Sequence, residues 1–266
     1  MTIIYPSPIF GPIHSRRLGI SLGINLQPAD GKICTFDCLY CECGLNASHP
    51  AHLRRPSREE VSEALEKKLK EMTKEGTIPD VLTFAGNGEP TTHPHFLEII
   101  CDTVALRNRY CPDAKVSVLS NATLCGRDSV RKALMMVDNN ILKLDTVSQE
   151  YILTVDRPTN PSYNVQDIIQ DLAAYNGHCI IQTMFMIGTG TVSENGVEKT
   201  VNVDNTSDDF LIPWLDAIKV IKPQQVMIYT IDRETPIPWL EKASPALLDT
   251  IAERVRQLGF PCSVSY

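Results

Sequence analysis

The sequence contains no long hydrophobic run and no hydrophobic signal segment at its start. The apolar stretch at residues 179–187 is far shorter than the roughly 20 residues that a membrane-spanning helix needs. The opening residues, MTIIYPSPIF, form only a short apolar stretch and include two prolines. Nine cysteines without a signal segment indicate a reducing compartment rather than a disulfide framework. We therefore expect a cytoplasmic protein with no membrane contact.

The sequence also lacks an excess of positive charge. It has 25 Lys and Arg residues against 32 Asp and Glu residues, so its formal net charge is −7 at pH 7. Proteins that bind a phosphate backbone generally have a basic balance, so nucleic acid is not favoured as a partner. Two local basic groups, at residues 14–17 and 52–58, are most simply interpreted as solvated surface with ion pairs.

No internal repeat and no low-complexity tract interrupts the chain, and 266 residues can bury a substantial core in a single domain. From residue 58 onward, helical and strand patterns alternate, which indicates βα units around a parallel sheet. The expected strands are 20–26, 80–85, 115–119, 141–144, 179–187 and 226–231. The expected helices are 57–72, 96–109, 127–137, 162–176, 210–221 and 244–258.

Helix ends are the most specific local signals. Ser57 with Glu60 three residues later predicts a capping box, and Gly76 predicts the end of that helix. Ser244 followed by Pro245 predicts the start of the last helix.

Three cysteines, Cys34, Cys38 and Cys41, form a C-x3-C-x2-C run. This run supplies three thiolates where a cubane iron–sulfur cluster has four irons, so one iron stays open for an exchangeable ligand. The residues between the cysteines can shield such a cluster from water. They include Phe36, Leu39 and Tyr40.

A fourth thiol, Cys43, lies close to the run and keeps an alternative open. Cys34, Cys38, Cys41 and Cys43 together have the ligand types of a structural zinc site, although residues two apart rarely point the same way. On that interpretation the protein is a non-catalytic iron–sulfur or zinc binding module. The remaining cysteines have no second cluster spacing, and most of them are expected to be small buried hydrophobic residues. They are Cys101, Cys111, Cys125, Cys179 and Cys262.

The segment CTFDCLYC, residues 34–41, resembles the cluster loop of the radical S-adenosylmethionine (SAM) superfamily. In that family SAM chelates the open iron, and an electron from the cluster cleaves SAM to methionine and a 5′-deoxyadenosyl radical. The resemblance implies a 4Fe–4S cluster and SAM as cofactors. It also implies an α/β fold, a partial (β/α)6 barrel, as one radical SAM domain over residues 1–266.

Residues 86–90, GNGEP, follow the expected strand 80–85 and resemble the family's GGE-type motif, which hydrogen-bonds the amino group of SAM. The resemblance assigns Gly86, Asn87, Gly88 and Glu89 to cofactor binding, with Asn87 in place of a glycine where a backbone contact suffices. Without that context the segment is only a turn.

Further cofactor contacts are expected at the ends of the later strands. Ser120 and Asn121 resemble a segment that meets the ribose and methionine parts of SAM in relatives, and a local turn is the alternative. Asp145 ends the fourth strand and could accept hydrogen bonds from ribose hydroxyls. Gln182 lies inside an apolar strand, which favours a ligand-facing role because an unpartnered buried amide is costly; a satisfied core glutamine is the alternative. Tyr40 completes the set of cofactor-binding residues.

Residues 189–206 are rich in Gly, Ser, Asn and Thr, and an Asn-Gly pair at 195–196 predicts a small hairpin inserted after the fifth strand. At the mouth of an α/β barrel such an insertion would act as a lid over a reactive intermediate. Arg16, Arg17 and Arg157 are candidates for pairing with a carboxylate or phosphate. The His93-Pro-His95 segment is expected to start a helix rather than to bind a metal.

The segments at 11–19 and 227–236 resemble the group that includes wyosine-synthase-type iron–sulfur oxidoreductases. Those enzymes modify transfer RNA and use a second cluster on upstream cysteines, whereas this sequence has no cysteine before Cys34. Modification of tRNA is therefore the alternative function. The preferred one is hydrogen abstraction from a small-molecule or protein substrate, with a reductant such as flavodoxin or ferredoxin as partner.

Overall fold

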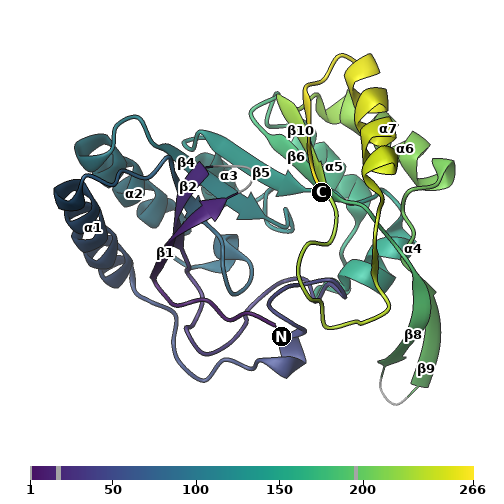
Figure 1. Ribbon diagram of the computed structural model, residues 1–266, viewed down its shortest axis with the longest axis horizontal. Helices are drawn as coiled ribbons and strands as arrows, with labels where there is room; N and C mark the ends of the chain where they lie inside the picture. Colours follow the sequence, from purple (N-terminus) through teal and green to yellow (C-terminus); the bar gives the residue numbers. More distant parts are fainter. Residues whose placement is uncertain (1, 16–18, 195–196) are drawn as a thin grey trace. The chain divides into compact units, whose positions relative to one another are not determined.

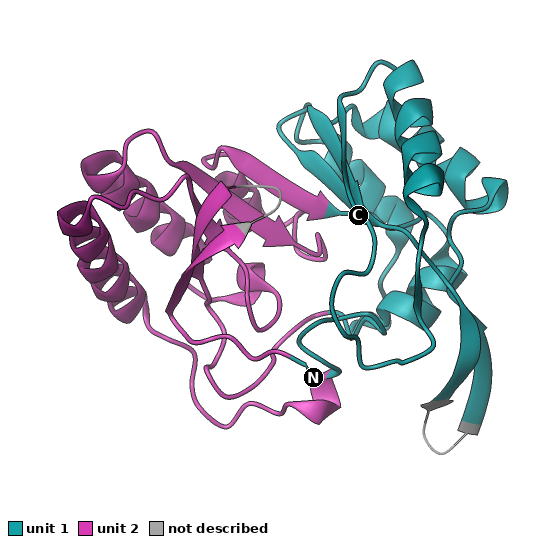
Figure 2. Cartoon of the chain, viewed as in Figure 1, with its two compact units in different colours: residues 1–2, 36–45, 143–266 teal, residues 3–35, 46–142 magenta. Residues whose placement is uncertain are grey.

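The computed structural model describes residues 2–15, 19–194 and 197–266 (Figure 1). The chain divides into two compact units (Figure 2). Unit 1 comprises residues 1–2, 36–45 and 143–266, and unit 2 comprises residues 3–35 and 46–142. The C-x3-C-x2-C loop therefore contributes Cys34 to unit 2 and both Cys38 and Cys41 to unit 1. The expectation of one domain over the whole chain stays a prediction.

Unit 2 is an α/β structure built on the first strands of the sheet. Strand β1 (Ile9–Ser15) pairs antiparallel with β2 (Gly19–Ile24), which is followed in parallel by β3 (Val81–Phe84), β4 (Lys115–Ser120) and β5 (Asn139–Lys143, whose last residue belongs to unit 1). The helices are α1 (Arg58–Glu75), α2 (Phe96–Tyr110) and α3 (Asp128–Leu134), with short 3₁₀ turns at Asn46–Ser48 and Pro90–Thr92. α1 and α2 pack against each other (Figure 1).

The sequence of helix α1 accounts for its start, its end and its buried face. Ser57 Oγ accepts from the Glu60 backbone N–H at 3.3 Å, and the Glu60 carboxylate accepts from the Ser57 N–H at 2.7 Å, which confirms the capping box. Gly76 ends the helix in the left-handed conformation at φ 73°. The apolar stripe is fully buried and fixes the helix on the sheet. Its members are Val61, Leu65, Leu69 and Met72.

Unit 1 continues the α/β pattern with parallel strands β6 (Ile180–Met184), β10 (Gln225–Tyr229) and β12 (Cys262–Ser265), in that order. Its helices are α4 (Gln149–Tyr151), a π-helical turn (Ile152–Asp156), α5 (Val165–Ala173), α6 (Asp208–Ile221) and α7 (Pro245–Gln257). Two small antiparallel pairs complete it: β7 (Met186–Ile187) with β11 (Glu241–Lys242), and β8 (Thr189–Glu194) with β9 (Val197–Asn202).

The expected insertion is a hairpin, as predicted: β8 and β9 pair from Thr189 with Asn202 to Glu194 with Val197. The expected turn residues, 195–196, lie outside the described part of the chain. The hairpin base packs on the body of unit 1, because Val201 and Val203 belong to the same buried cluster as Leu39 and Tyr40 of the cysteine loop.

The structure adds elements that the sequence pattern did not predict. β1 contains a Gly-Pro pair and is antiparallel, which is the kind of edge position where proline is tolerated. β12 has four partly exposed residues and no clear alternation. α4 and the π-helical turn are short, and the helix expected at 162–176 starts only at Val165, because Asn164 caps it. Within the described ranges no helix is long and apolar enough to cross a membrane.

Candidate active site

In unit 2, the start of the cysteine loop lies directly against the GNGEP turn. The Ile33 N–H donates to the Asn87 carbonyl at 3.0 Å, and the Glu89 N–H donates to the Ile33 carbonyl at 3.1 Å. Gly88, with φ 127°, leaves the space for this approach, because a Cβ at that position would stand 1.9 Å from the Ile33 carbonyl oxygen. The turn therefore fixes the backbone of the residue that precedes Cys34.

Asn87 is fully buried, and its side chain forms hydrogen bonds with the protein backbone. Its amide donates to the carbonyls of Tyr5 and Pro28 at 2.9 Å each, and its oxygen accepts from the Tyr5 N–H at 2.7 Å. Gly86, at φ 129°, lies against Asn25, whose Cγ would be 2.7 Å from an added Cβ. The structure thus gives both residues a role in holding the turn, and their predicted contact with SAM stays a prediction.

Glu89 is 2% exposed and joins the turn to the end of β4. One carboxylate oxygen, Oε1, accepts from Thr91 N and Oγ1 and from Ser120 Oγ, at 2.6–3.1 Å. The other, Oε2, accepts from the Asn121 N–H at 2.7 Å. Desolvation raises the pKa of Glu89, while these hydrogen bonds oppose the rise. Oε2 retains acceptor capacity for a further donor.

Asn121 connects this network to the first cysteine. Its amide donates to Thr35 Oγ1 at 2.8 Å and lies 3.6 Å from Cys34 Sγ, while its oxygen accepts from the N–H and hydroxyl of Thr123. Three side chains that the resemblance selected, Glu89, Ser120 and Asn121, thus stand together beside Cys34. An amide N–H near a cysteine sulfur stabilises the thiolate, which is the form that binds iron.

In unit 1, the second part of the cysteine loop is held by the π-helical turn. The Asp37 N–H donates to the Asp156 carbonyl at 2.9 Å, and the Leu39 N–H donates to the Val155 carbonyl at 2.9 Å. Arg157, in the left-handed region at φ 51°, forms an ion pair with the Asp37 side chain. Arg157 therefore pairs with a carboxylate of the loop itself, and π-helical turns of this kind are frequent at functional sites.

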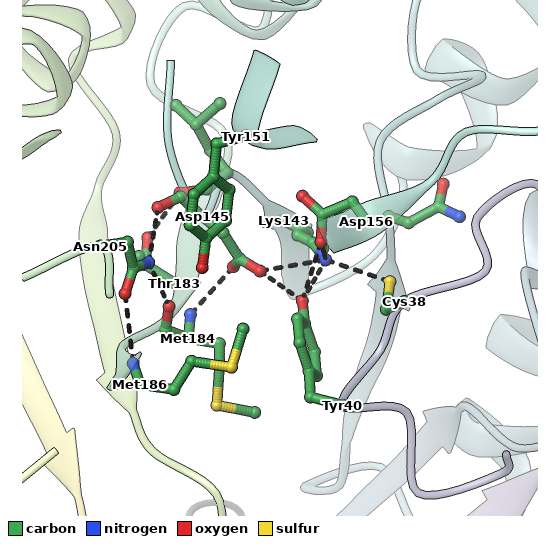
Figure 3. Close-up of polar contacts among 12 residues, drawn as sticks. Cys38, Tyr40, Lys143, Asp145, Tyr151, Asp156, Thr183, Met184, Met186 and Asn205 are labelled. Atoms are coloured by element: carbon green, nitrogen blue, oxygen red, sulfur yellow. Dashed lines mark hydrogen bonds and ion pairs between the residues drawn. The ribbon is translucent and has the colours of Figure 1, made fainter. Parts of the chain in front are cut away.

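A buried charge network lies beside Cys38 (Figure 3). Lys143 Nζ is 3.4 Å from Cys38 Sγ, 2.5 Å from Asp156 Oδ1 and 3.0 Å from Asp145 Oδ2, and it also donates to the Tyr40 hydroxyl. The Tyr40 hydroxyl in turn donates to Asp145. Both carboxylates are at most 2% exposed at the side chain. One cation thus faces two buried carboxylates and a sulfur in a largely buried site.

Burial and charge set the protonation of this network. Desolvation alone would lower the pKa of Lys143, but the charges of Asp145, Asp156 and Cys38 raise it well above its usual value, so the amine is an ammonium. Burial raises the pKa of Asp156 to about 6, against the opposing effect of Lys143. Burial also raises the pKa of Tyr40 well above its usual value, so its hydroxyl stays a donor.

Asn205 supports the same region from the segment after the hairpin. Its amide donates to the Met184 carbonyl at 2.8 Å and the Asp145 carbonyl at 3.2 Å, and its oxygen accepts from the Met186 N–H at 3.1 Å (Figure 3). Asp145 Oδ1 also accepts from the Met184 N–H at 2.9 Å. The end of β6 and Asp145 are therefore locked together.

Gln182 on β6 is 8% exposed, and no residue in the described part of the chain forms a hydrogen bond with its side-chain amide. The amide is nevertheless not one of the fully buried polar groups that lack a partner among the described residues. A ligand-facing role and a satisfied core glutamine therefore both stay predictions.

Expectations were also made for two arginines, for the His-Pro-His segment and for the cysteines outside the three-cysteine run. Arg16 and Arg17 lie outside the described residues. His93 and His95 precede α2 as expected, and His93 Nε2 lies 2.9 Å from the Pro56 carbonyl oxygen. Most of the cysteines outside the three-cysteine run are buried, as expected, whereas Cys262 is partly buried and Cys101, on α2, is exposed.

Sequence reasoning missed Lys143, Asp156 and Asn205. A signal existed for Lys143, since a lysine within the short run ILKL at 141–144 needs a partner if it is buried. Asp156 ends the π-helical turn and Asn205 lies outside any helix or strand, so no spacing in the sequence indicates that these side chains turn inward.

The cysteine loop fits an iron–sulfur cluster. Within unit 2 an N–H donor stands 3.6 Å from the sulfur of Cys34, and within unit 1 another stands 3.4 Å from the sulfur of Cys38. Phe36, Leu39 and Tyr40 are buried, and their shielding of a cluster stays a prediction. Among the residues that the structure describes, no three His, Cys, Asp or Glu side chains gather as ligands of a single ion. A cubane cluster needs no such group, because each thiolate binds a different iron.

Comparison with known proteins identifies the family. The model of the radical SAM superfamily matches residues 30–203. A UPF0026 protein of Helicobacter pylori is 31% identical over 227 residues, which are 85% of this chain and 66% of the relative. The chain spans 57–66% of the length of the first three curated relatives that it matches.

Solved structures agree on the fold. A radical SAM methyltransferase from Sphaerobacter thermophilus superposes with a TM-score of 0.63 at 15% identity, over 92% of this chain and 66% of that one. TYW1, a wyosine synthase, solved with a lysine-pyruvate adduct bound, gives a TM-score of 0.60 at 13% identity, over 89% and 73%. These likenesses confirm the α/β fold with a partial barrel, and the wyosine-synthase group is represented among them as expected.

The family match also confirms the expected cofactor types at the level of the family, whose enzymes use a 4Fe–4S cluster and SAM. The cysteine run, the GNGEP turn and the family model, which covers more than half of the sequence, all lead to one assignment. The chain belongs to the radical SAM superfamily.

Proposed function

We propose that this protein is a radical SAM enzyme that abstracts a hydrogen atom from its substrate. Cys34, Cys38 and Cys41 would hold the 4Fe–4S cluster. When bound, the cluster supplies the electron that cleaves SAM to methionine and a 5′-deoxyadenosyl radical, which then takes one hydrogen atom from the substrate to give 5′-deoxyadenosine. The observation that carries the proposal is the three-cysteine loop with an N–H donor beside two of its sulfurs.

Residues of both units would contribute to ligand binding and to the exclusion of water. In unit 2, Glu89 would keep acceptor capacity on Oε2 for the SAM ammonium. Gly86 and Gly88 would hold the turn in place through their close approach to Asn25 and Ile33. In unit 1, the Gln182 amide, for which the described residues offer no hydrogen-bond partner, would be available to a ligand. Phe36, Leu39 and Tyr40 exclude water from the cysteine loop, which a radical reaction requires.

The test is formation of 5′-deoxyadenosine by anaerobically reconstituted protein given SAM and dithionite, measured by chromatography with mass detection. Cys38→Ala should lose iron and product together. Cys43→Ala is the matched control and should keep both, because the cluster does not use that thiol. Loss of bound metal in Cys43→Ala, with zinc rather than iron in the parent, would favour the four-cysteine zinc site instead.

The alternative of a wyosine-synthase-like activity on tRNA is supported by the likeness to TYW1. The net charge of −7 speaks against it, because binding to a phosphate backbone generally uses a basic surface. Addition of tRNA to the same assay discriminates between the two. If tRNA raises the amount of 5′-deoxyadenosine many-fold and the digested RNA contains a modified guanosine, then tRNA is the substrate rather than a small molecule or a protein.

A further inference from the structure

Lys143 makes a contact that the proposed chemistry does not by itself require. Two buried carboxylates, Asp145 and Asp156, need a counter-charge, and Lys143 provides it at 3.0 Å and 2.5 Å. Yet the same ammonium also approaches Cys38 Sγ to 3.4 Å (Figure 3). A lysine that served only the carboxylates would have no reason to point a hydrogen at this sulfur.

The surroundings keep this charge in place and unscreened. The Lys143 side chain is 12% exposed, and the rings of Phe36 and Tyr40 lie 5.1 Å and 4.6 Å from Nζ. Aromatic faces at that distance attract an ammonium. Water and salt screen a buried charge far less than an exposed one, so solvent weakens the interaction of the ammonium with Cys38 only a little.

We propose that Lys143 is a positioning residue that raises the reduction potential of the cluster through Cys38, which rests on the proposed function. The step concerned is transfer of one electron from an external donor to the cluster, with no proton taken up. Reduction adds one negative charge beside Cys38. A cation 3.4 Å from the ligating sulfur stabilises that charge, and hydrogen bonds to cluster sulfurs act in the same direction.

A substitution at Asp156 should shift the reduction potential in the opposite direction to a substitution at Lys143. Its carboxylate lies 2.5 Å from Lys143 Nζ. The negative charge of this carboxylate partly cancels the positive potential that the ammonium produces at Cys38. Removing the lysine charge should therefore lower the potential, and removing the Asp156 charge should raise it. Mere loosening of the site would let water in and shift both variants in one direction, since solvent exposure is itself a determinant of cluster potential.

The experiment compares reconstituted wild-type protein with Lys143→Gln, Lys143→Arg, Asp156→Asn and Lys219→Gln. Lys219→Gln is the matched control: it makes the same charge change in unit 1, but Lys219 is exposed and pairs only with Asp216 in the described ranges. Iron and sulfide are quantified first. A mediated redox titration, followed by electron paramagnetic resonance of the reduced cluster, then gives each midpoint potential.

In Lys143→Gln we expect the equilibrium constant for reduction to fall at least tenfold, a shift of about 59 mV for one electron. Asp156→Asn should shift the other way, and Lys143→Arg and Lys219→Gln should stay within threefold of wild type. An unchanged or raised potential in Lys143→Gln overturns the proposal. If that variant holds no cluster, an unchanged or lowered potential in Asp156→Asn overturns it. Absence of a cluster in the wild-type protein would instead overturn the proposed function.

Discussion

Replacement of Gly88 by alanine tests the close approach between the cysteine loop and the GNGEP turn. The added Cβ would stand 1.9 Å from the Ile33 carbonyl oxygen and 2.5 Å from its carbon, both of which are backbone atoms. No side-chain rotation can relieve such a contact. The two chain segments must therefore move apart by more than 1 Å to reach ordinary van der Waals distance, which is about 3.4 Å.

The cost follows from what that movement breaks. The hydrogen bonds from Ile33 N to Asn87 O and from Glu89 N to Ile33 O flank the contact, and each contributes about 0.5–1.5 kcal/mol. The backbone of Gly88, at φ 127°, adds strain of about 1–3 kcal/mol for a residue with a side chain. We expect Gly88→Ala to lower the free energy of unfolding by about 4 kcal/mol, a large part of a typical total.

Gly76→Ala provides the matched control, because Gly76 also has a positive φ, of 73°, but nothing lies within 4 Å of its added Cβ. Its cost should be only the conformational strain, about 1 kcal/mol. Urea unfolding of the apoproteins, followed by circular dichroism, gives both values, and iron uptake on reconstitution should fall only in Gly88→Ala. Equal costs for the two variants would show that the close approach is not present in solution.

Three further predictions follow from other parts of the chain. Ser57→Ala should lower the free energy of unfolding by about 1 kcal/mol without changing iron content, because it removes the capping box of α1; a change below 0.2 kcal/mol in denaturant unfolding would contradict this. Burial raises the pKa of Cys179 to about 12, so above pH 9 its thiol ionises first in the unfolded chain and its stabilising contribution is lost as the pH rises toward 12. Cys179→Ala should therefore remove about 1.4 kcal/mol per pH unit from the alkaline decline in stability, and parallel declines in both proteins would refute it. Deletion of residues 189–202, the β8–β9 hairpin, should raise SAM cleavage that is not coupled to substrate; unchanged coupling would remove its role as a lid.

The sequence predicted most of the fold because its signals were local. Apolar runs located the strands β2 to β6 and β10, and cap residues such as Ser57 and Ser244 located helix starts to within a residue. β1 escaped because it contains a Gly-Pro pair, and β12 escaped because its four residues show no clear alternation of buried and exposed positions. The π-helical turn escaped because no short repeat distinguishes five residues of π-helix from an α-helix.

For the candidate site, the resemblance selected residues, but it could not predict what each side chain does. Glu89, Ser120 and Asn121 do lie together, as the positions at the ends of neighbouring parallel strands indicate. The network of Lys143 and Asp156 was invisible because it depends on how an irregular segment returns to β5. Contacts of that kind are set by tertiary packing, which no spacing in the sequence records.

The hydrogen bonds of the motif residues separate the substitutions that should affect SAM from those that should affect the scaffold. The Asn87 amide donates to the carbonyls of Tyr5 and Pro28, and its oxygen accepts from the Tyr5 N–H. Replacement of Asn87 should therefore lower the stability of the fold without a direct effect on SAM affinity. Glu89 Oε1 accepts from three donors, whereas Oε2 accepts from only one, so a conservative change there should weaken both the turn and the proposed contact with SAM. The Gln182 amide has no hydrogen-bond partner in the described ranges, and its loss should leave stability nearly unchanged. A change in SAM or substrate affinity in a Gln182 variant of unchanged stability would therefore support the proposed ligand contact at this position.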